Sequence, residues 1–378
     1  MFSFSNNKSY LGINLGNGGV KVVELAAQGH RPRLVTYGYT ETPVDLIKPL
    51  EPEQELEKAI IVLNKVVSES KTESRRVIAA LPSFAVFSSI ISLPNMSKDE
   101  LAQAINWEAK KFVPLPIEDM VLDWRPLDEH KEGLGVFGRK KKEDLSGSTD
   151  SSLIKEISSS MKGGNPKQQK VLVTAAPKDL VDRYIRLFKA SELELIALET
   201  EGFALERALI GRDPSMIMVV NMGSYSTDIA IIESGIPVLT RSVDVGGETI
   251  TQAVAKSLNI DNHRAEQFKR DIGFISKEIN SIPKVIETTI NPIINEIKYS
   301  FDLYLGQHKQ VSIEKIILTG GSSTLPGLVG YLKKILNINV FVGDPWARTI
   351  YPLELKPVLQ EIGPRFAVSV GLAMREII

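Results

Sequence analysis

Two glycine-rich turns, far apart in the chain, carry the residue types that could hold a phosphate group. The first turn, residues 16–19 (GNGG), joins apolar runs within residues 10–25, and the second, residues 221–227 (NMGSYST), joins apolar runs within residues 216–233. Turns of this composition can point several backbone N–H groups and hydroxyls into one concavity, where phosphate binds. Each turn alone also fits an ordinary β-hairpin. As a pair with matching flanks, they predict two related lobes that face one cleft.

The elements around these turns predict an α/β protein. Asn14 aligns with Asn221 at the end of an apolar run, and a further candidate strand follows each hairpin. Helical spacing of apolar residues predicts the helices, and short apolar runs predict buried strands. The expected helices cover residues 53–69, 178–190, 200–210, 249–258, 263–272, 283–305 (with a kink at Pro292) and 365–376, and the other expected strands cover 34–42, 76–80, 171–175, 193–198, 237–243 and 315–318. This alternation of strands and helices indicates partly parallel sheets.

One segment of the chain has a different pattern of expected strands and helices and looks like an insertion in the first lobe. Residues 84–127 read as a strand–helix–strand unit, and Ser97 and Glu100 form a capping box at the start of its helix. Residues 128–169 are rich in Gly, Ser and Lys, which predicts a flexible excursion. We therefore expect a first lobe (1–83 and 178–212), an inserted subdomain (84–177), a second lobe (213–362) and a closing helix (363–378).

Two motif-like stretches fall within that excursion. Residues 133–138 have the spacing of a dinucleotide-binding glycine motif, but no clear strand precedes them and no helix follows, so we reject that interpretation. The basic run at residues 139–142 fits either a contact with anionic lipid or a solvated loop. We favour the solvated loop.

The composition excludes several classes of function. The chain has 378 residues, a formal net charge of −1 and no cysteine, so disulfides, thiolate nucleophiles and Cys-based zinc sites are excluded. Nothing global attracts nucleic acid, and the histidines lack metal-ligand spacing. No apolar run approaches the length of a membrane span, and the N-terminus lacks a signal-peptide pattern. We expect a cytoplasmic protein.

These features together resemble the actin-like ATPase superfamily. The resemblance comprises both phosphate hairpins, the GGSS turn at 320–323 after an apolar run, and the AEQFKR helix at 265–270. Residues 80–124 resemble, more specifically, the PilM family of type IV pilus assembly proteins, and residues 199–207 and 317–328 add to this match. The resemblance implies a two-lobed actin-like fold, which is a duplicated ribonuclease-H-like fold, with a small subdomain inserted in the first lobe.

The resemblance also implies an ATP site with Mg²⁺. Lys21 would lie near the phosphates, while Glu266 and Lys269 would face the ribose and adenine. The full set of implied nucleotide-binding residues is Asn14, Gly16, Asn17, Gly18, Gly19, Lys21, Asn221, Gly223, Ser224, Ser226, Thr227, Gly246, Gly247, Glu266, Lys269, Gly320, Gly321 and Ser322. Taken singly, these residues also fit ordinary structure, since Glu266 and Lys269 could be a solvated helix pair.

Asparagine stands at two positions, Asn14 and Asn221, where the superfamily usually has aspartate. In that superfamily the carboxylates help to orient waters around Mg²⁺ and the attacking water. An amide keeps a hydrogen bond but loses the charge that holds a hard cation. Glu199 or Glu201 remains to position water, and the sequence does not choose between them. We therefore expect binding of Mg-ATP, with Mg²⁺ held through water near the asparagines, and slow or absent hydrolysis.

The resemblance implies a role as a cytoplasmic platform at the inner membrane. Proteins of the PilM family capture the cytoplasmic N-terminal tail of the membrane protein PilN, in a groove beside the inserted subdomain. We expect that groove near residues 84–112, although Trp107 and Phe112 each fit better as core residues. Contacts with other pilus assembly proteins are also implied, and self-association is left open.

Two other functions of the superfamily stay open at this point. A sugar or acid kinase would need a carboxylate base beside a hydroxyl substrate, and the two asparagines argue against it. A filament-forming division ATPase resembling FtsA would end in an amphipathic membrane helix. The printed sequence instead ends shortly after its expected closing helix.

Overall fold

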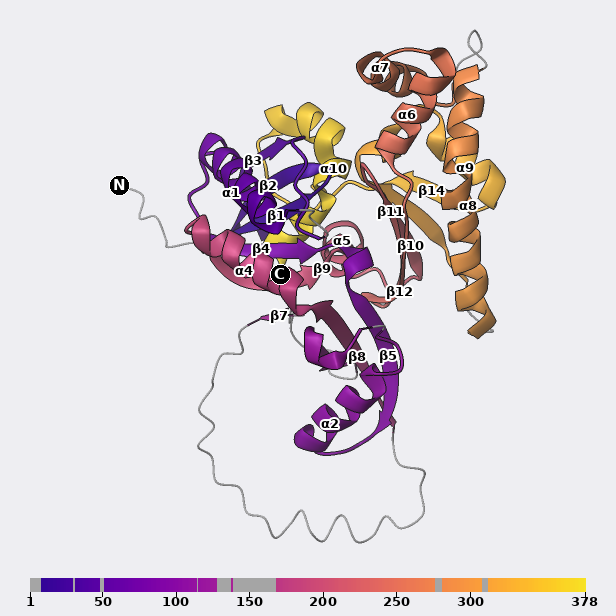
Figure 1. Ribbon diagram of the computed structural model, residues 1–378. Helices are drawn as coiled ribbons and strands as arrows, with labels where there is room; N and C mark the ends of the chain where they lie inside the picture. Colours follow the sequence, from indigo (N-terminus) through magenta and orange to yellow (C-terminus); the bar gives the residue numbers. More distant parts are fainter. Residues whose placement is uncertain are drawn as a thin grey trace, which may run out of the picture.

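The computed structural model describes residues 8–29, 31–47, 51–113, 115–127, 137–138, 168–275, 281–307 and 312–378. Two lobes lie side by side, each built on its own sheet, and a smaller unit extends from the first lobe (Figure 1). The predicted two-lobed, duplicated architecture is confirmed.

The first lobe is built on a mixed sheet. Its strands are β1 (Ser9–Gly16), β2 (Gly19–Gln28), β3 (Arg31–Thr40), β4 (Arg76–Leu81), β9 (Glu194–Thr200) and the short β7 (Phe137–Gly138). Their order is β3-β2-β1-β4-β9-β7. The first three strands pair antiparallel, whereas β4 lies parallel to both β1 and β9.

The second lobe repeats that pattern. Its strands are β10 (Ile217–Met222), β11 (Thr227–Glu233), β12 (Ile236–Val243), β13 (Lys315–Thr319) and β14 (Asn339–Val342), in the order β12-β11-β10-β13-β14. Again a three-stranded antiparallel meander is followed by two parallel strands. The two glycine-rich turns therefore occupy equivalent places, between β1 and β2 and between β10 and β11.

Helices cover both sheets. In the first lobe α1 (Pro52–Glu69) packs beside α4 (Lys178–Ala190), and in the second α6 (Gly247–Leu258) packs on α7 (Asn262–Ile272) and α8 (Ser281–Gln307), the long helix at the outer side of Figure 1. Pro292 lies inside α8, which continues through it. The helix α9 (Leu328–Leu336) and strand β14 were not predicted from the sequence.

Two helices run through the middle of the molecule. α5 (Glu201–Leu205) continues as a π-helical turn (Glu206–Ile210), and α10 (Lys356–Met374) crosses it. A side-chain carbon on Gly371 would lie 1.8 Å from the Ala204 carbonyl oxygen, so only glycine permits this contact. α10 begins at Lys356 and not at residue 365, so the expected boundary between 362 and 363 falls inside it. Pro364 lies inside α10, which continues through it.

The inserted subdomain is a three-stranded sheet with one helix. Strands β5 (Phe87–Pro94), β8 (Gln168–Pro177) and β6 (Met120–Pro126) lie in that order beside α2 (Lys98–Ala109). The capping box of Ser97 and Glu100 is confirmed. Trp107 was expected in the core but is 68% exposed, because it lies off the face that buries Leu101 and Ile105. Phe112 is half-buried and packs against the core, as expected.

The predicted excursion at 128–169 lies almost wholly outside the described residues. Only residues 137–138, which pair with β9 as β7, and residues 168–169, at the start of β8, are described. The basic run at 139–142 and most of the glycine motif at 133–138 also fall outside.

Candidate functional site

The two glycine-rich turns meet between the lobes. A side-chain carbon placed on Gly18 would lie 3.3 Å from Cβ of Ser224 and 3.7 Å from Nζ of Lys21. Lys21 also donates a hydrogen bond to the Gly18 carbonyl at 3.0 Å. Turns from opposite lobes and one cation therefore border the same space.

The second turn is braced by the start of α6. The Gly247 and Glu248 N–H groups donate to the carbonyls of Gly223 and Ser224 at 2.9 and 2.8 Å. A side chain on Gly246 would come within 2.5 Å of the Ser224 carbonyl oxygen, so glycine is needed for this approach. Inside the turn, Gly223 N–H donates to Ser226 at 2.9 Å.

Thr227 of the second turn faces away from this space, whereas the first turn is open around Asn17 and Gly16. The Thr227 hydroxyl donates to the Val245 carbonyl at 2.7 Å, so it holds the loop before α6. Asn17 is exposed at the tip of the first turn, and a side chain at Gly16 would meet nothing within 4 Å.

A buried lysine, Lys269, pairs with the partly exposed Glu266 beside that turn. Nζ of Lys269 donates to Gly247 O and Thr251 Oγ1, both at 2.9 Å, and pairs with Glu266 at 2.5 Å. Lys269 is only 4% exposed, and burial lowers its pKa while Glu266 opposes that shift. The alternative of a solvated surface pair is therefore wrong.

The turn of small residues after β13 (320–323) forms the remaining part of the cleft wall that the second lobe contributes. A side-chain carbon on Gly247 would lie 2.6 Å from Ser322 Oγ, so this turn adjoins α6. Gly320 has φ of +86°, and a side chain there would come within 2.8 Å of Asn221 Oδ1. Its N–H donates to the Pro364 carbonyl of α10 at 2.9 Å.

A buried carboxyl pair, Glu201 and Asp228, lies beside the two asparagines. Asn221 Nδ2 lies 3.5 Å from Glu201 Oε2, and Glu201 also hydrogen bonds with Asn14 and Asp228. Burial, and then the nearby charge of Asp228, raise the pKa of Glu201 to about 8. Burial raises the pKa of Asp228 to about 6. At neutral pH the pair therefore holds about one proton.

Asp228 was missed from the sequence, although the hairpin register could have found it. Asn221 and Asp228 lie directly opposite each other in the β10–β11 ladder. Opposite residues of an antiparallel pair project from the same face of the sheet. Counting back from the second turn would thus have placed Asp228 beside Asn221.

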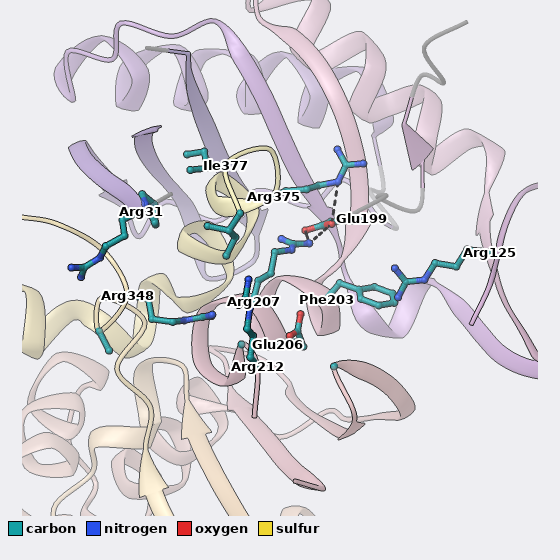
Figure 2. Close-up of a pocket in the computed structure, with 15 residues that line it drawn as sticks. Arg31, Arg125, Glu199, Phe203, Glu206, Arg207, Arg212, Arg348, Arg375 and Ile377 are labelled. Carbon is teal, nitrogen blue, oxygen red and sulfur yellow. Dashed lines mark hydrogen bonds and ion pairs between the residues drawn. The ribbon is translucent and has the colours of Figure 1, made fainter. Parts of the chain in front are cut away.

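Glu199 lies outside this cluster. Both of its carboxylate oxygens accept from Arg207 Nη2 at 2.5 and 2.6 Å, and Arg375 Nε lies 3.6 Å away (Figure 2). Two glutamates were candidates for positioning water. In the structure, Glu201 lies beside the two glycine-rich hairpins, whereas Glu199 points away from them.

Glu199 instead lines a cavity of about 780 Å³ near the crossing of α5 and α10 (Figure 2). Arginines dominate its lining. They are Arg31, Arg125, Arg207, Arg212, Arg348 and Arg375, against the acidic Glu199 and Glu206. Buried guanidinium nitrogens of Arg125, Arg348 and Arg375 have no hydrogen-bond partner among the described residues. Burial raises the pKa of Glu206 to about 7. This cavity could not be predicted from the sequence, because its arginines come from distant parts of the chain.

Comparison with known proteins decides the family. The model of the family described as "Type IV pilus assembly protein PilM" matches residues 12–135 and 156–377. The chain belongs to the PilM family. A chain of the solved "PilM-PilN type IV pilus biogenesis complex" is 27% identical, with a TM-score of 0.77 over 98% of each chain.

More distant relatives agree on the fold of this PilM-family chain. The ethanolamine utilization protein EutJ of Carboxydothermus hydrogenoformans (15% identity, TM-score 0.53) covers 99% of this chain and 92% of its own. Spiroplasma citri MreB5, solved bound to AMPPNP (14%, 0.50), covers 97% and 95%.

Among curated proteins, the division protein FtsA of Bacillus subtilis is 22% identical over 63% of this chain and 54% of its own length. FtsA of Neisseria meningitidis is 28% identical over 41% of each. The chain thus spans about half the length of these curated relatives, or less.

The donor set of the cleft fits a hydrated cation better than a protein-held one. Within the described ranges, no group of three or more His, Asp or Glu side chains could hold a metal ion. Burial raises the pKa of both Glu201 and Asp228 beside the amide side chains, which lowers the negative charge available to a cation, and Mg²⁺ keeps several waters when few carboxylates are offered. Separately, no helix in the described part of the chain has the length and apolar character needed to cross a bilayer.

Proposed function

We propose that this PilM-family chain is an ATP-binding cytoplasmic scaffold of the type IV pilus assembly machine. The observation that carries the proposal is the meeting of the two turns, with Gly18 and Ser224 in near contact. Lys21 on one side and buried Lys269 on the other supply positive charge to the same cleft. A nucleotide bound there joins the two lobes.

The roles follow from position. The turns at 16–19 and 223–226 face the phosphates, and Gly320, Gly321 and Ser322 face the adenosine, with Glu266 and Lys269 alongside. Asn14 and Asn221 would hold Mg²⁺ through water, and Mg²⁺ bound with ATP would supply neutralisation of the phosphate charge. The protein positions the nucleotide and the metal ion, and Glu201 orients water beside the phosphates.

Hydrolysis is expected to be slow. A general base needs to be unprotonated at the working pH, and the raised pKa of Glu201 keeps it largely protonated at pH 7. The test combines equilibrium binding of ATP with a phosphate-release assay on the same protein. We expect binding, and a gain of about 2.7 kcal/mol in unfolding free energy at 100 times Kd, without brisk turnover. Rapid phosphate release would refute the scaffold assignment.

We further propose that the partner is the cytoplasmic tail of a PilN-like inner-membrane protein, which would hold the chain at that membrane. The solved PilM–PilN complex supports this choice of partner. The arginine-lined cavity is our preferred site for the tail, since it lies between the inserted subdomain, represented by Arg125, and the body of the molecule. The region 84–112 stays a second prediction, because its exposed Phe84 and Trp107 do not line that cavity.

Titration of a labelled PilN-like tail peptide separates the two sites. Phe203→Ala removes a cavity residue whose ring lies 4.0 Å from the Arg125 guanidinium. We expect this change to weaken peptide binding at least about 10-fold, and Trp107→Ala to leave it unchanged. The reverse result would indicate that the peptide binds near residues 84–112. If the wild-type protein binds no peptide, the proposed PilN-like partner is wrong.

An FtsA-like filament is the second candidate, because the curated relatives are FtsA proteins. Pelleting of the protein with ATP tests it. The scaffold proposal expects the chain to stay in the supernatant, and nucleotide-dependent sedimentation would favour the filament. Contacts with other pilus assembly proteins remain part of the proposal.

A further inference from the structure

We propose that Arg365 binds the phosphate chain of the nucleotide, and that Glu41 competes with phosphate for it. This inference rests on the proposed nucleotide function. Neither residue was among those expected from the sequence, because Arg365 lies within α10, outside every motif of the cleft.

One side of Arg365 lies against the proposed adenosine turn. The preceding residue, Pro364, accepts hydrogen bonds through its carbonyl from Gly320 N–H and Thr319 Oγ1, both at 2.9 Å. These bonds fix the turn of the second lobe on α10. A side-chain carbon on Gly321 would then lie 3.7 Å from Arg365 Nε.

The other side of Arg365 reaches the first phosphate turn. Arg365 Nη1 lies 3.0 Å from Glu41 Oε1. Glu41 follows β3 and packs beside the turn, since a side-chain carbon on Gly19 would lie 2.9 Å from the Glu41 Cα. The guanidinium therefore spans from the adenosine turn to the phosphate turn, which is the path of a nucleotide's phosphate chain.

The charges around Arg365 favour an anion there. Burial lowers the pKa of Lys21, Glu201 opposes this shift, and the charge of Arg365 adds to it, so the two cations are close enough to repel each other. Glu41 is 67% exposed, and a pair with so exposed a carboxylate is weak. A phosphate accepts two parallel hydrogen bonds from guanidinium and is the stronger partner.

Binding of ATP, ADP and adenosine to the full chain tests this role. We expect Arg365→Gln to weaken ATP and ADP about 10-fold or more and to leave adenosine within about two-fold. Glu41→Gln should raise the affinity for ATP about two- to five-fold, because it removes the carboxylate that competes with phosphate for Arg365. Arg365→Lys should recover part of the loss. Arg186→Gln, which breaks an exposed ion pair with Glu53 on α1, is the matched control and should change nothing.

Each other outcome overturns the inference. Unchanged ATP affinity in Arg365→Gln, equal loss of adenosine, or weaker ATP binding in Glu41→Gln would contradict it while leaving the nucleotide site intact. A wild-type protein that binds none of the three ligands would instead refute the proposed function itself. Thermal unfolding of each variant confirms that the chain folds.

Discussion

The two phosphate hairpins share a strand pattern but differ in how they are supported. In the second lobe, α6 donates two backbone hydrogen bonds to the turn, and Lys269 is buried behind it. In the first lobe, Lys21 bonds its own turn at Gly18, and space is open around Gly16. The ladder partners differ too, since Asn14 lies opposite Lys21 whereas Asn221 lies opposite Asp228. The comparison teaches that packing against α6 braces the second half of the cleft, whereas the first turn is held by a hydrogen bond from its own Lys21.

The largest expected difference between the two lobes comes from alanine substitutions at a glycine of each lobe. Gly246→Ala places a carbon within 2.5 Å of backbone, whereas Gly16→Ala meets nothing within 4 Å. We expect Gly246→Ala to lower the unfolding free energy by about 3 kcal/mol and to abolish ATP binding, and Gly16→Ala to cost below about 1 kcal/mol. Urea unfolding with ATP titration measures both, and equal effects would contradict the difference between lobes.

The two lysines should separate stability from binding. Lys269→Met removes a buried cation with three partners and leaves Glu266 without it, so we expect a loss of about 2–4 kcal/mol in unfolding free energy. Lys21→Met should leave the unfolding free energy nearly unchanged but should lower the affinity for ATP at least about 10-fold. Thermal melts and ATP titrations distinguish them, and a Lys21→Met protein that unfolds would reject this division.

The carboxyl pair predicts a pH effect on stability. The folded-state pKa of Glu201 lies near 8, above its ordinary 4.5, so the folded state binds more protons than the unfolded state between these values. Stability from this group is therefore complete below about pH 4.5 and is lost as pH rises toward 8. Glu201→Gln removes that loss and should be more stable than wild type at pH 8 by about 1–3 kcal/mol. Identical pH profiles from urea unfolding would argue against the shared proton.

Restoring aspartate at each asparagine gives the smallest expected difference. Asn14→Asp places a carboxylate opposite Lys21, whereas Asn221→Asp places one opposite Asp228. Opposite charges across a ladder stabilise and like charges destabilise, so we expect changes of about 0.5–1 kcal/mol with opposite signs at pH 8. At pH 5, where Asp228 is largely protonated, the penalty for Asn221→Asp should shrink. Two changes of the same sign would show that ladder partners do not decide the effect.

The parts of the fold that could be predicted are those coded locally. Each hairpin has its turn residues and apolar strands within one short window, and the capping box of α2 lies within four consecutive positions. The start of α10 was not found this way, because the apolar pattern was followed only from residue 365, just after Pro364. In the structure, the carbonyl of Pro364 instead bonds the turn of the other lobe. That contact is tertiary and leaves no local trace.

The site was predicted unevenly for the same reason. Glycines that allow backbone to approach backbone, such as Gly246, are visible as motifs. The choice between Glu199 and Glu201 was not, because both follow an apolar run and only the path from β9 into α5 separates them. The arginine-lined cavity is the extreme case, since its residues are gathered by the crossing of distant elements.

Gly371 of α10 packs directly against the Ala204 backbone of α5. Along these two segments, Glu201 and Arg365 belong to the nucleotide cleft, whereas Arg207 and Arg375 line the arginine-lined cavity. A methyl group at Gly371 would force the two helices apart at this contact. The missing side chain of one glycine therefore supports a helix packing to which both sites are attached.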